Sequence, residues 1–375
     1  MLRILLKLVK WIAILMVVVV LIPVIGLAYG WVTTPAFEPS PPTTVAQGAP
    51  PAAISAGIER EIPGYRRPEE STFLTYPEWA IVYAAREYAG FVAGAHESGF
   101  PYWRYIGRFW QDYAMVVRAT ADHPFNSQNH LMLVVIGTSH TIEHAIQSVW
   151  ENTVGRLTEW AAGWKKTPTD RFQAITAAEY AAFLDQVPWY RFPYGEKRAG
   201  LWGTPSAPGT AAIRSSERKI AFGISYTIKQ IYAALIAGGL EATSDPAELD
   251  IHVWARGPVE EAIAGEADTA LELDLGPQGA VFVTRRYQVF TDMIPRLIAR
   301  GVEFVEIAGN GRILVTLLSN DAIDLPDGAR ELFAYQLPAE PFVRRTGLVA
   351  PVARLHEILP AVLSPEVRLE HVYDY

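Results

Sequence analysis

The chain contains no cysteine, and this absence excludes several kinds of site at once. It rules out disulfides, zinc sites with cysteine ligands, iron–sulfur clusters and catalysis by a thiol. A chain without thiols also suits an oxidising compartment such as a periplasm, where stray thiols would be paired.

Positive charge is also scarce. The chain has 32 Lys and Arg against 40 Asp and Glu, which gives a formal net charge of −8. Binding to a phosphate backbone needs a concentrated positive surface, so this balance argues against nucleic acid as a partner. There is no long run of like charge, and therefore no polybasic or acidic tail is indicated.

Common catalytic and nucleotide-binding signatures are missing as well. The chain has no G-x-S-x-G nucleophile elbow, no Walker sequence and no G-x-G-x-x-G fingerprint. No signature therefore marks nucleotide binding, and the sequence leaves the cofactor undetermined. A divalent metal, bound through histidines discussed below, is a minor candidate.

What the chain has in abundance is apolar residues: half of its 375 residues are hydrophobic. From Trp11 to Val32 they form an unbroken run, preceded by the basic residues Arg3, Lys7 and Lys10. About 20 apolar residues span a hydrocarbon core of roughly 30 Å, and basic residues before the span favour a cytoplasmic N-terminus. The sequence thus predicts a transmembrane anchor over residues 1–32 of a single-pass inner-membrane protein with a periplasmic bulk.

Two alternatives to this single anchor stay open at this point. A cleaved signal peptide would have a shorter apolar region and a small-residue cleavage site. Residues 131–150 and 220–240 are each long enough to be further membrane spans. Four ionisable side chains would then lie at membrane depth, which is costly: His140, Glu143, His144 and Lys229. The sequence therefore favours one span.

Beyond the anchor, changes in composition and residue pattern divide the chain into three parts. Residues 33–70 are rich in Pro, Thr and Ala, which predicts an extended tether. Residues 71–243 read as a helical domain, with capping boxes at Thr75–Glu78 and Thr176–Glu179. Residues 244–375 read as an α+β domain.

One predicted helix of the middle part carries residues suited to metal binding or catalysis. His140-Thr-Ile-Glu143-His144 lies in an apolar setting, and residues four apart share one face of a helix. His140, His144, Gln147 and Glu151 therefore form a polar stripe with Glu143 at its border. Two imidazoles at that spacing suit zinc, and a carboxylate beside them activates a bound water. This interpretation makes His140, His144 and Glu151 metal ligands and Glu143 the catalytic residue.

The string HTIEH resembles the H-x-x-E-H motif of the inverzincin metallopeptidases. The resemblance covers these five residues only. In that family a glutamate from a later helix completes the metal site, and the resemblance implies Glu217 as the nearest candidate here.

A structural interpretation of the same residues competes with the metal site. Residues 220–240 predict a second apolar helix, and its Lys229 is a partner for a carboxylate of the first helix. Buried charges are rarely left alone, because removing an ion from water costs several kcal/mol. In this interpretation Glu143, Gln147 and Lys229 form a buried polar network, which the sequence favours over the metal.

The C-terminal part alternates runs of β-branched residues with a helical segment. Four strands are predicted, at Ile251–Ala255, Ala280–Arg285, Glu303–Ile307 and Ile313–Leu318. A helix is predicted between the second and third of them, at Val289–Arg300. Ala308-Gly-Asn-Gly311 predicts a hairpin turn between the last two strands. These elements suggest a small α+β sandwich with one sheet, ferredoxin-like as a first expectation.

Three functions compete on these grounds. The first is a non-enzymatic accessory, scaffold or assembly factor, whose partners would be membrane lipid and another membrane or periplasmic protein. It predicts an extensive apolar surface on the helical domain. The second is a metal-dependent hydrolase that uses the HTIEH helix. The third is a protein that binds lipid or another apolar ligand in an aromatic-lined cavity.

Overall fold

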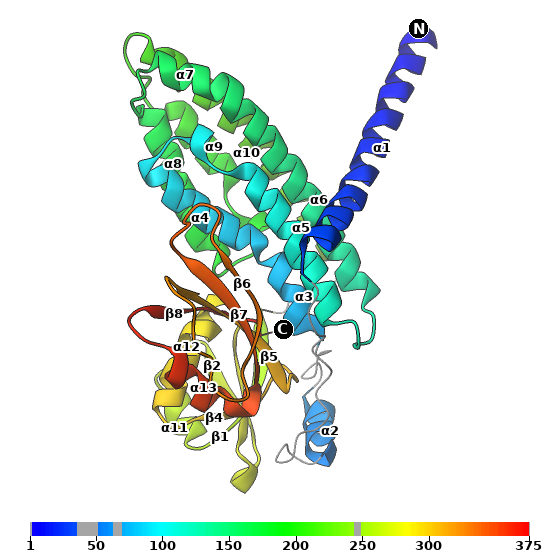
Figure 1. The fold of residues 1–375 in the computed structure, drawn as a ribbon, viewed down its shortest axis with the longest axis vertical. Helices are drawn as coiled ribbons and strands as arrows, with labels where there is room; N and C mark the ends of the chain where they lie inside the picture. The colour runs from blue at the N-terminus through cyan, green and yellow to red at the C-terminus, as the bar shows by residue number, and fades with distance from the viewer. Residues whose placement is uncertain (1, 36–51, 63–69, 244–248, 375) are drawn as a thin grey trace.

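The structure, a computed structural model, describes residues 2–35, 52–62, 70–243 and 249–374. Helices occupy one end of the molecule and two antiparallel sheets the other, and the long N-terminal helix leans away from the helical bundle (Figure 1). The helices before the first strand are α1 Leu2–Thr33, α2 Ala52–Glu61, α3 Glu70–Glu78, α4 Ala80–Gly94, α5 Tyr102–Ala119, α6 Ser127–Trp150, α7 Arg156–Ala161, α8 Pro168–Leu184, α9 Tyr194–Gly203 and α10 Ala211–Thr243.

Two four-stranded antiparallel sheets follow. The first has the order β2-β3-β1-β4 and the second the order β6-β7-β5-β8. The strands are β1 Asp250–Arg256, β2 Thr269–Asp274, β3 Ala280–Arg285, β4 Glu303–Ile307, β5 Arg312–Ser319, β6 Arg330–Gln336, β7 Arg344–Pro351 and β8 Val367–Val372. The helices between them are α11 Val259–Ile263, α12 Gln288–Ala299 and α13 Leu355–Val362.

The expected single ferredoxin-like sheet is therefore wrong. The four predicted strands and the helix after β3 are present as β1, β3, β4, β5 and α12. The second sheet was missed because its other strands carry charged residues at buried positions. Arg345 in β7 and both Glu370 and His371 in β8 are at most 4 % exposed, and such residues break the apolar alternation that indicates a strand.

The turn after β4 also differs from the predicted hairpin. Ala308 and Gly309 adopt positive φ angles of 49° and 81°, as a tight turn requires. However, β4 pairs with β1, whereas β5 pairs with β7 and β8. The turn therefore carries the chain from one sheet to the other instead of joining two paired strands.

The structure also contradicts the predicted membrane anchor. Across the residues that the structure describes, no helix combines the length and the apolar character needed to cross a bilayer. One face of the C-terminal half of α1 packs against α5: Gly26 and Gly30 lie against Trp110, and Arg118 donates to the Trp31 carbonyl oxygen at 2.7 Å. The prediction of a single-pass inner-membrane protein with a periplasmic bulk is thus wrong.

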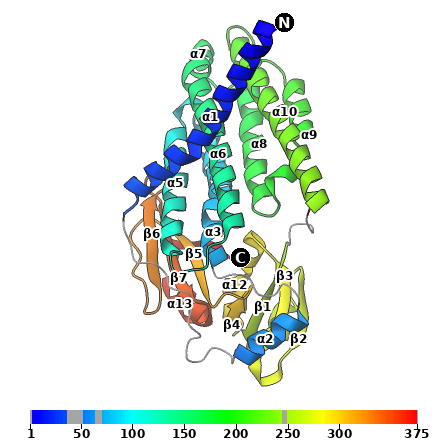
Figure 2. The same ribbon diagram turned by 90° about the vertical axis from the view of Figure 1, so that its right-hand side faces the viewer.

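The predicted tether lies partly outside the described residues, which omit 36–51 and 63–69. Between these gaps, residues 52–61 form α2, which lies beside the first sheet (Figure 2). Ile58 of α2 and Ile62, which follows the helix, are buried against Trp254 and Val281 of that sheet. This part of the segment is therefore a packed helix.

The helices and the second sheet share one hydrophobic core. Trp110 and Tyr113 of α5 are buried in the same cluster as Leu314 of β5 and Phe333 of β6. Hydrogen bonds cross this junction too, since the Thr72 hydroxyl donates to the Tyr373 carbonyl at 2.8 Å and accepts from the Leu314 amide at 3.1 Å. The junction joins both parts of the chain into one packed unit.

Candidate functional site

The histidines of the HTIEH sequence lie on α6, which Asn126 caps by accepting a hydrogen bond from the Asn129 amide. The rings of His140 and His144 face each other, with centroids 3.9 Å apart. His144 Nδ1 donates to the His140 carbonyl oxygen at 3.0 Å, and His140 bonds the backbone of Tyr105. Burial lowers the pKa of both imidazoles below the usual value, so both are neutral near pH 7.

Glu143 is engaged by the residues of the predicted polar network. Its carboxylate lies 2.7 Å from Lys229 Nζ of α10 and accepts a hydrogen bond from Gln147 at 3.2 Å. The Glu143 side chain is 40 % exposed, so this ion pair is part-screened by solvent and contributes little stability. The pair connects the side chains of α6 and α10.

Glu151 does not join the two histidines. It is the first residue of a π-helix, Glu151–Gly155, and its carboxylate lies 2.9 Å from Arg218 of α10. A Cβ atom at Gly155 would lie 2.4 Å from Glu151 Oε2, so a side chain there would displace the Glu151 carboxylate. The π-helix, a form often seen at functional sites, points Glu151 toward Arg218.

The structure therefore does not assemble His140, His144 and Glu151 into one metal site. Glu217, the candidate implied by the inverzincin resemblance, bonds Trp150 Nε1 at 2.7 Å and both guanidiniums of α10. Within the described ranges, the group whose ligand atoms lie within 4.8 Å of one another is His96, Glu97 and Glu159. Sequence reasoning missed this group because Glu159 lies far from the other two along the chain.

Glu97 and Glu159 of that group also belong to a larger set of buried charges, which we call the arginine cluster. It consists of Arg214 and Arg218 with five carboxylates: Glu97, Glu151, Glu159, Asp170 and Glu217. Neither arginine has exposed surface, and each carboxylate residue is at most 7 % exposed. Asp170 also completes a capping box with Thr167 at the start of α8. The cluster thus ties α7, α8 and α10 together.

A small pocket lies where α4 and α5 meet the second sheet. Its lining includes Glu87, Tyr105, His140, Tyr335 and Arg345. It has room for about one or two water molecules. His140 Nε2 is buried and has no hydrogen-bond partner among the described residues. The pocket is too small and too polar to hold a lipid, so it gives the apolar-ligand hypothesis no support.

The helical part also carries an apolar surface on α10. We call it the outer face of α10, and it consists of Ile213, Ile220, Ile224, Ile228, Ile231 and Leu235. Each of these side chains is 49–69 % exposed. The charged residues of the same helix face the other way: Arg214, Glu217 and Arg218 are buried. From Ile213 to Leu235 no charged residue of α10 falls in the exposed class.

The neighbouring helix α6 shows the same pattern, with apolar side chains exposed and a polar one buried. α6 and α7 run beside α10 (Figure 1), and α6 turns His140 inward while exposing Leu131, Val135 and Ile146. Water-facing helices ordinarily show the opposite pattern, with polar residues outside and apolar residues inside. The sequence offered a signal for this surface, because residues 131–150 and 220–240 were both predicted as long apolar helical segments.

Comparisons with known proteins give no relative to set beside these features. No protein-family model matches the chain, and no curated protein or solved structure matches it either.

Proposed function

We propose that the protein is a non-enzymatic accessory or scaffold protein that binds a partner protein through the outer face of α10. The observation that carries this proposal is the uncharged row of six exposed aliphatic side chains on one helix. Monomeric proteins rarely expose a contiguous apolar patch larger than a few hundred Å², and larger patches mark interaction sites.

The spacing of the row defines the chemistry of the partner. From Ile220 to Leu235 its members are separated by four, four, three and four residues. Steps of three and four place side chains on one seam of a helix, which is the pattern that packs against another helix. The partner that fits is a protein with an uncharged, apolar helical stripe, since a charge opposite this face would be desolvated without compensation.

The competing functions have less support from the described residues. Glu143, the proposed catalytic base, is held by Lys229, and the predicted metal ligands on α6 and in the π-helix do not converge. Binding of an apolar ligand would need a cavity much larger than the pocket beside His140.

Site-specific photocrosslinking in the full chain tests the proposal. A photoreactive amino acid is placed at Ile228, and the control carries it at Glu260, an exposed residue of α11. We expect one discrete protein adduct from position 228 and none from 260. Mass spectrometry should map the adduct to an apolar helix of the partner.

The double variant Ile224→Lys/Ile231→Lys supplies the second arm. Both side chains are exposed, so the variant should fold like the wild type while losing the adduct at least tenfold. Adducts with lipid alone, with a second copy of this chain, or equally from both positions would overturn the proposed partner.

A further inference from the structure

The arginine cluster has an unbalanced charge. Five carboxylates share only two guanidiniums, so the acidic side chains of the cluster outnumber its basic ones by three. Glu97 and Glu159 are 2 % and 0 % exposed, so water does not screen them. Buried ions of one sign are costly unless a proton or a cation neutralises them.

His96 lies at the edge of this cluster with a fixed orientation. Its Nε2 lies 3.0 Å from the carbonyl oxygen of Trp164, which only accepts hydrogen bonds, so Nε2 carries the proton. In the neutral ring, Nδ1 then carries no hydrogen and presents a lone pair. That atom is buried without a hydrogen-bond partner among the described residues, 3.9 Å from Glu159 Oε1. A lone pair facing a carboxylate is repulsive unless something positive lies between them.

We propose that His96, Glu97 and Glu159 bind a divalent transition-metal cation, Zn²⁺ or Mn²⁺. The three ligand atoms lie within 4.8 Å of one another, and small side-chain movements bring them to the distances of about 2.0–2.2 Å at which Zn²⁺ binds His and Glu. One imidazole nitrogen with two carboxylates suits these cations better than Mg²⁺ or Ca²⁺, which prefer oxygen ligands alone. The Trp164 carbonyl supplies the outer hydrogen bond that orients a metal-binding histidine.

Charge favours the cation even though Arg214 is close. Arg214 Nη2 lies 2.8 Å from Glu97 and 3.4 Å from Glu159, so the metal would share these carboxylates with a guanidinium. A divalent cation still reduces the excess of negative charge in the cluster by two. The site is separate from the outer face of α10, and it does not depend on the proposed partner.

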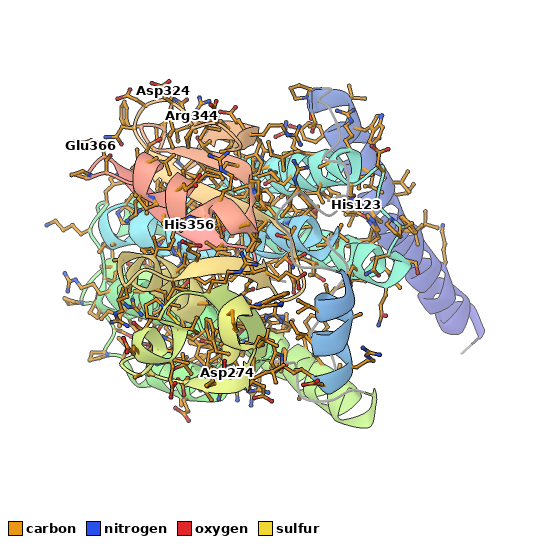
Figure 3. The ribbon with its side chains drawn as sticks, turned by 90° about the horizontal axis from the view of Figure 1, so that it is seen from below. His123, Asp274, Asp324, Arg344, His356 and Glu366 are labelled. Carbon is orange, nitrogen blue, oxygen red and sulfur yellow. The ribbon has the colours of Figure 1, made fainter. Side chains whose placement is uncertain are left out.

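Metal analysis of the full chain tests this site. The protein is purified without chelators, stripped with EDTA, and titrated with Zn²⁺, Mn²⁺ or Mg²⁺ while bound metal is measured by mass spectrometry. We expect about one equivalent of Zn²⁺ or Mn²⁺, no Mg²⁺, and at least tenfold weaker binding for His96→Ala. The matched control is His356→Ala, on α13 at the sheet end of the molecule (Figure 3).

A second variant separates this site from the histidines of α6. His140→Ala/His144→Ala should keep full binding, and loss of metal in that variant but not in His96→Ala would overturn the proposal. X-ray absorption at the zinc edge of the wild type gives a readout that needs no variant, and one nitrogen with oxygen ligands is expected. Absence of Zn²⁺ and Mn²⁺ binding to the wild type would overturn the proposal.

Discussion

At the scale of single residues, burial in the arginine cluster changes the pKa of Glu151. Arg218 has no exposed surface and lies 2.9 Å from Glu151 and 2.5 Å from Glu217. Burial raises the pKa of Glu151 to about 7, although Arg218 partly offsets this effect. The folded protein therefore binds a proton at Glu151 that the unfolded chain releases near pH 4.5.

This raised pKa predicts a dependence of stability on pH. Because the folded-state pKa exceeds the unfolded one, the contribution of Glu151 is fully present below about pH 4.5 and is lost as the pH rises through about 7. The loss is at most ~3 kcal/mol. We expect the free energy of unfolding in urea, measured in EDTA, to fall from pH 5 to pH 8 and Glu151→Gln to flatten that fall.

The control for this prediction is Glu357→Gln, since the Glu357 side chain is 54 % exposed and should leave the pH dependence unchanged. If Glu151→Gln keeps the wild-type slope between pH 5 and pH 8, Glu151 does not hold the proton.

The arginine cluster could not be predicted from the sequence, whereas part of the polar network on α6 and α10 could. The sequence pointed to Glu143, Gln147 and Lys229 because helical spacing places polar residues on one stripe. It offered no pattern for the arginine cluster, whose members come from distant segments such as Glu97 and Arg214. Spacing along one helix reports local neighbours, whereas a cluster of this kind depends on how several helices pack.

At the scale of elements, glycines set how closely α1 approaches α5. A Cβ atom at Gly30 would lie 2.1 Å from the Trp110 carbonyl oxygen, and one at Gly26 would lie 2.2 Å from the Trp110 ring. A backbone atom cannot move aside as a flexible side chain can, so the contact at Gly30 is the stricter one.

We therefore expect Gly30→Ala to push α1 away from α5. The overlap should cost about 1–3 kcal/mol in the free energy of unfolding and raise hydrogen exchange in both helices. Gly90→Ala is the matched control, since a Cβ atom at Gly90 in α4 meets nothing within 4 Å. Alanine there should be neutral or stabilising by about 0.5–1 kcal/mol. Equal stability of the two variants would mean that the helices do not pack this closely.

The elements that the sequence predicted well are those whose burial follows a simple pattern. β3 has the predicted bounds Ala280–Arg285, and its apolar residues fill the core. The capping box at Thr176–Glu179 was misplaced, because both residues lie inside α8, which begins with the capping box of Thr167 and Asp170. A capping sequence is short enough to recur within a helix, and the hydrogen bonds that distinguish a true cap are visible only in the structure.

At the scale of the whole molecule, Arg345 of β7 joins the helices to the second sheet. It makes two hydrogen bonds of 2.7 Å to Glu370 of β8 and reaches Glu87 of α4 at 3.3 Å. It also donates to the Tyr335 hydroxyl at 2.8 Å and stacks on the Tyr83 ring. Both carboxylates are buried, so each depends on this arginine for compensation.

Arg345→Met tests whether this junction makes the molecule cooperative. The variant leaves Glu87 and Glu370 buried without their cation, which should cost about 3–5 kcal/mol. Because one hydrophobic core spans the junction, hydrogen exchange should rise together in α4, α5, β6 and β7. Arg354→Met is the control: its pair with Glu357 is 43 % and 54 % exposed, and its loss should cost no more than about 1 kcal/mol. A rise confined to the helices or to the sheet would show that the two parts unfold independently despite the shared core.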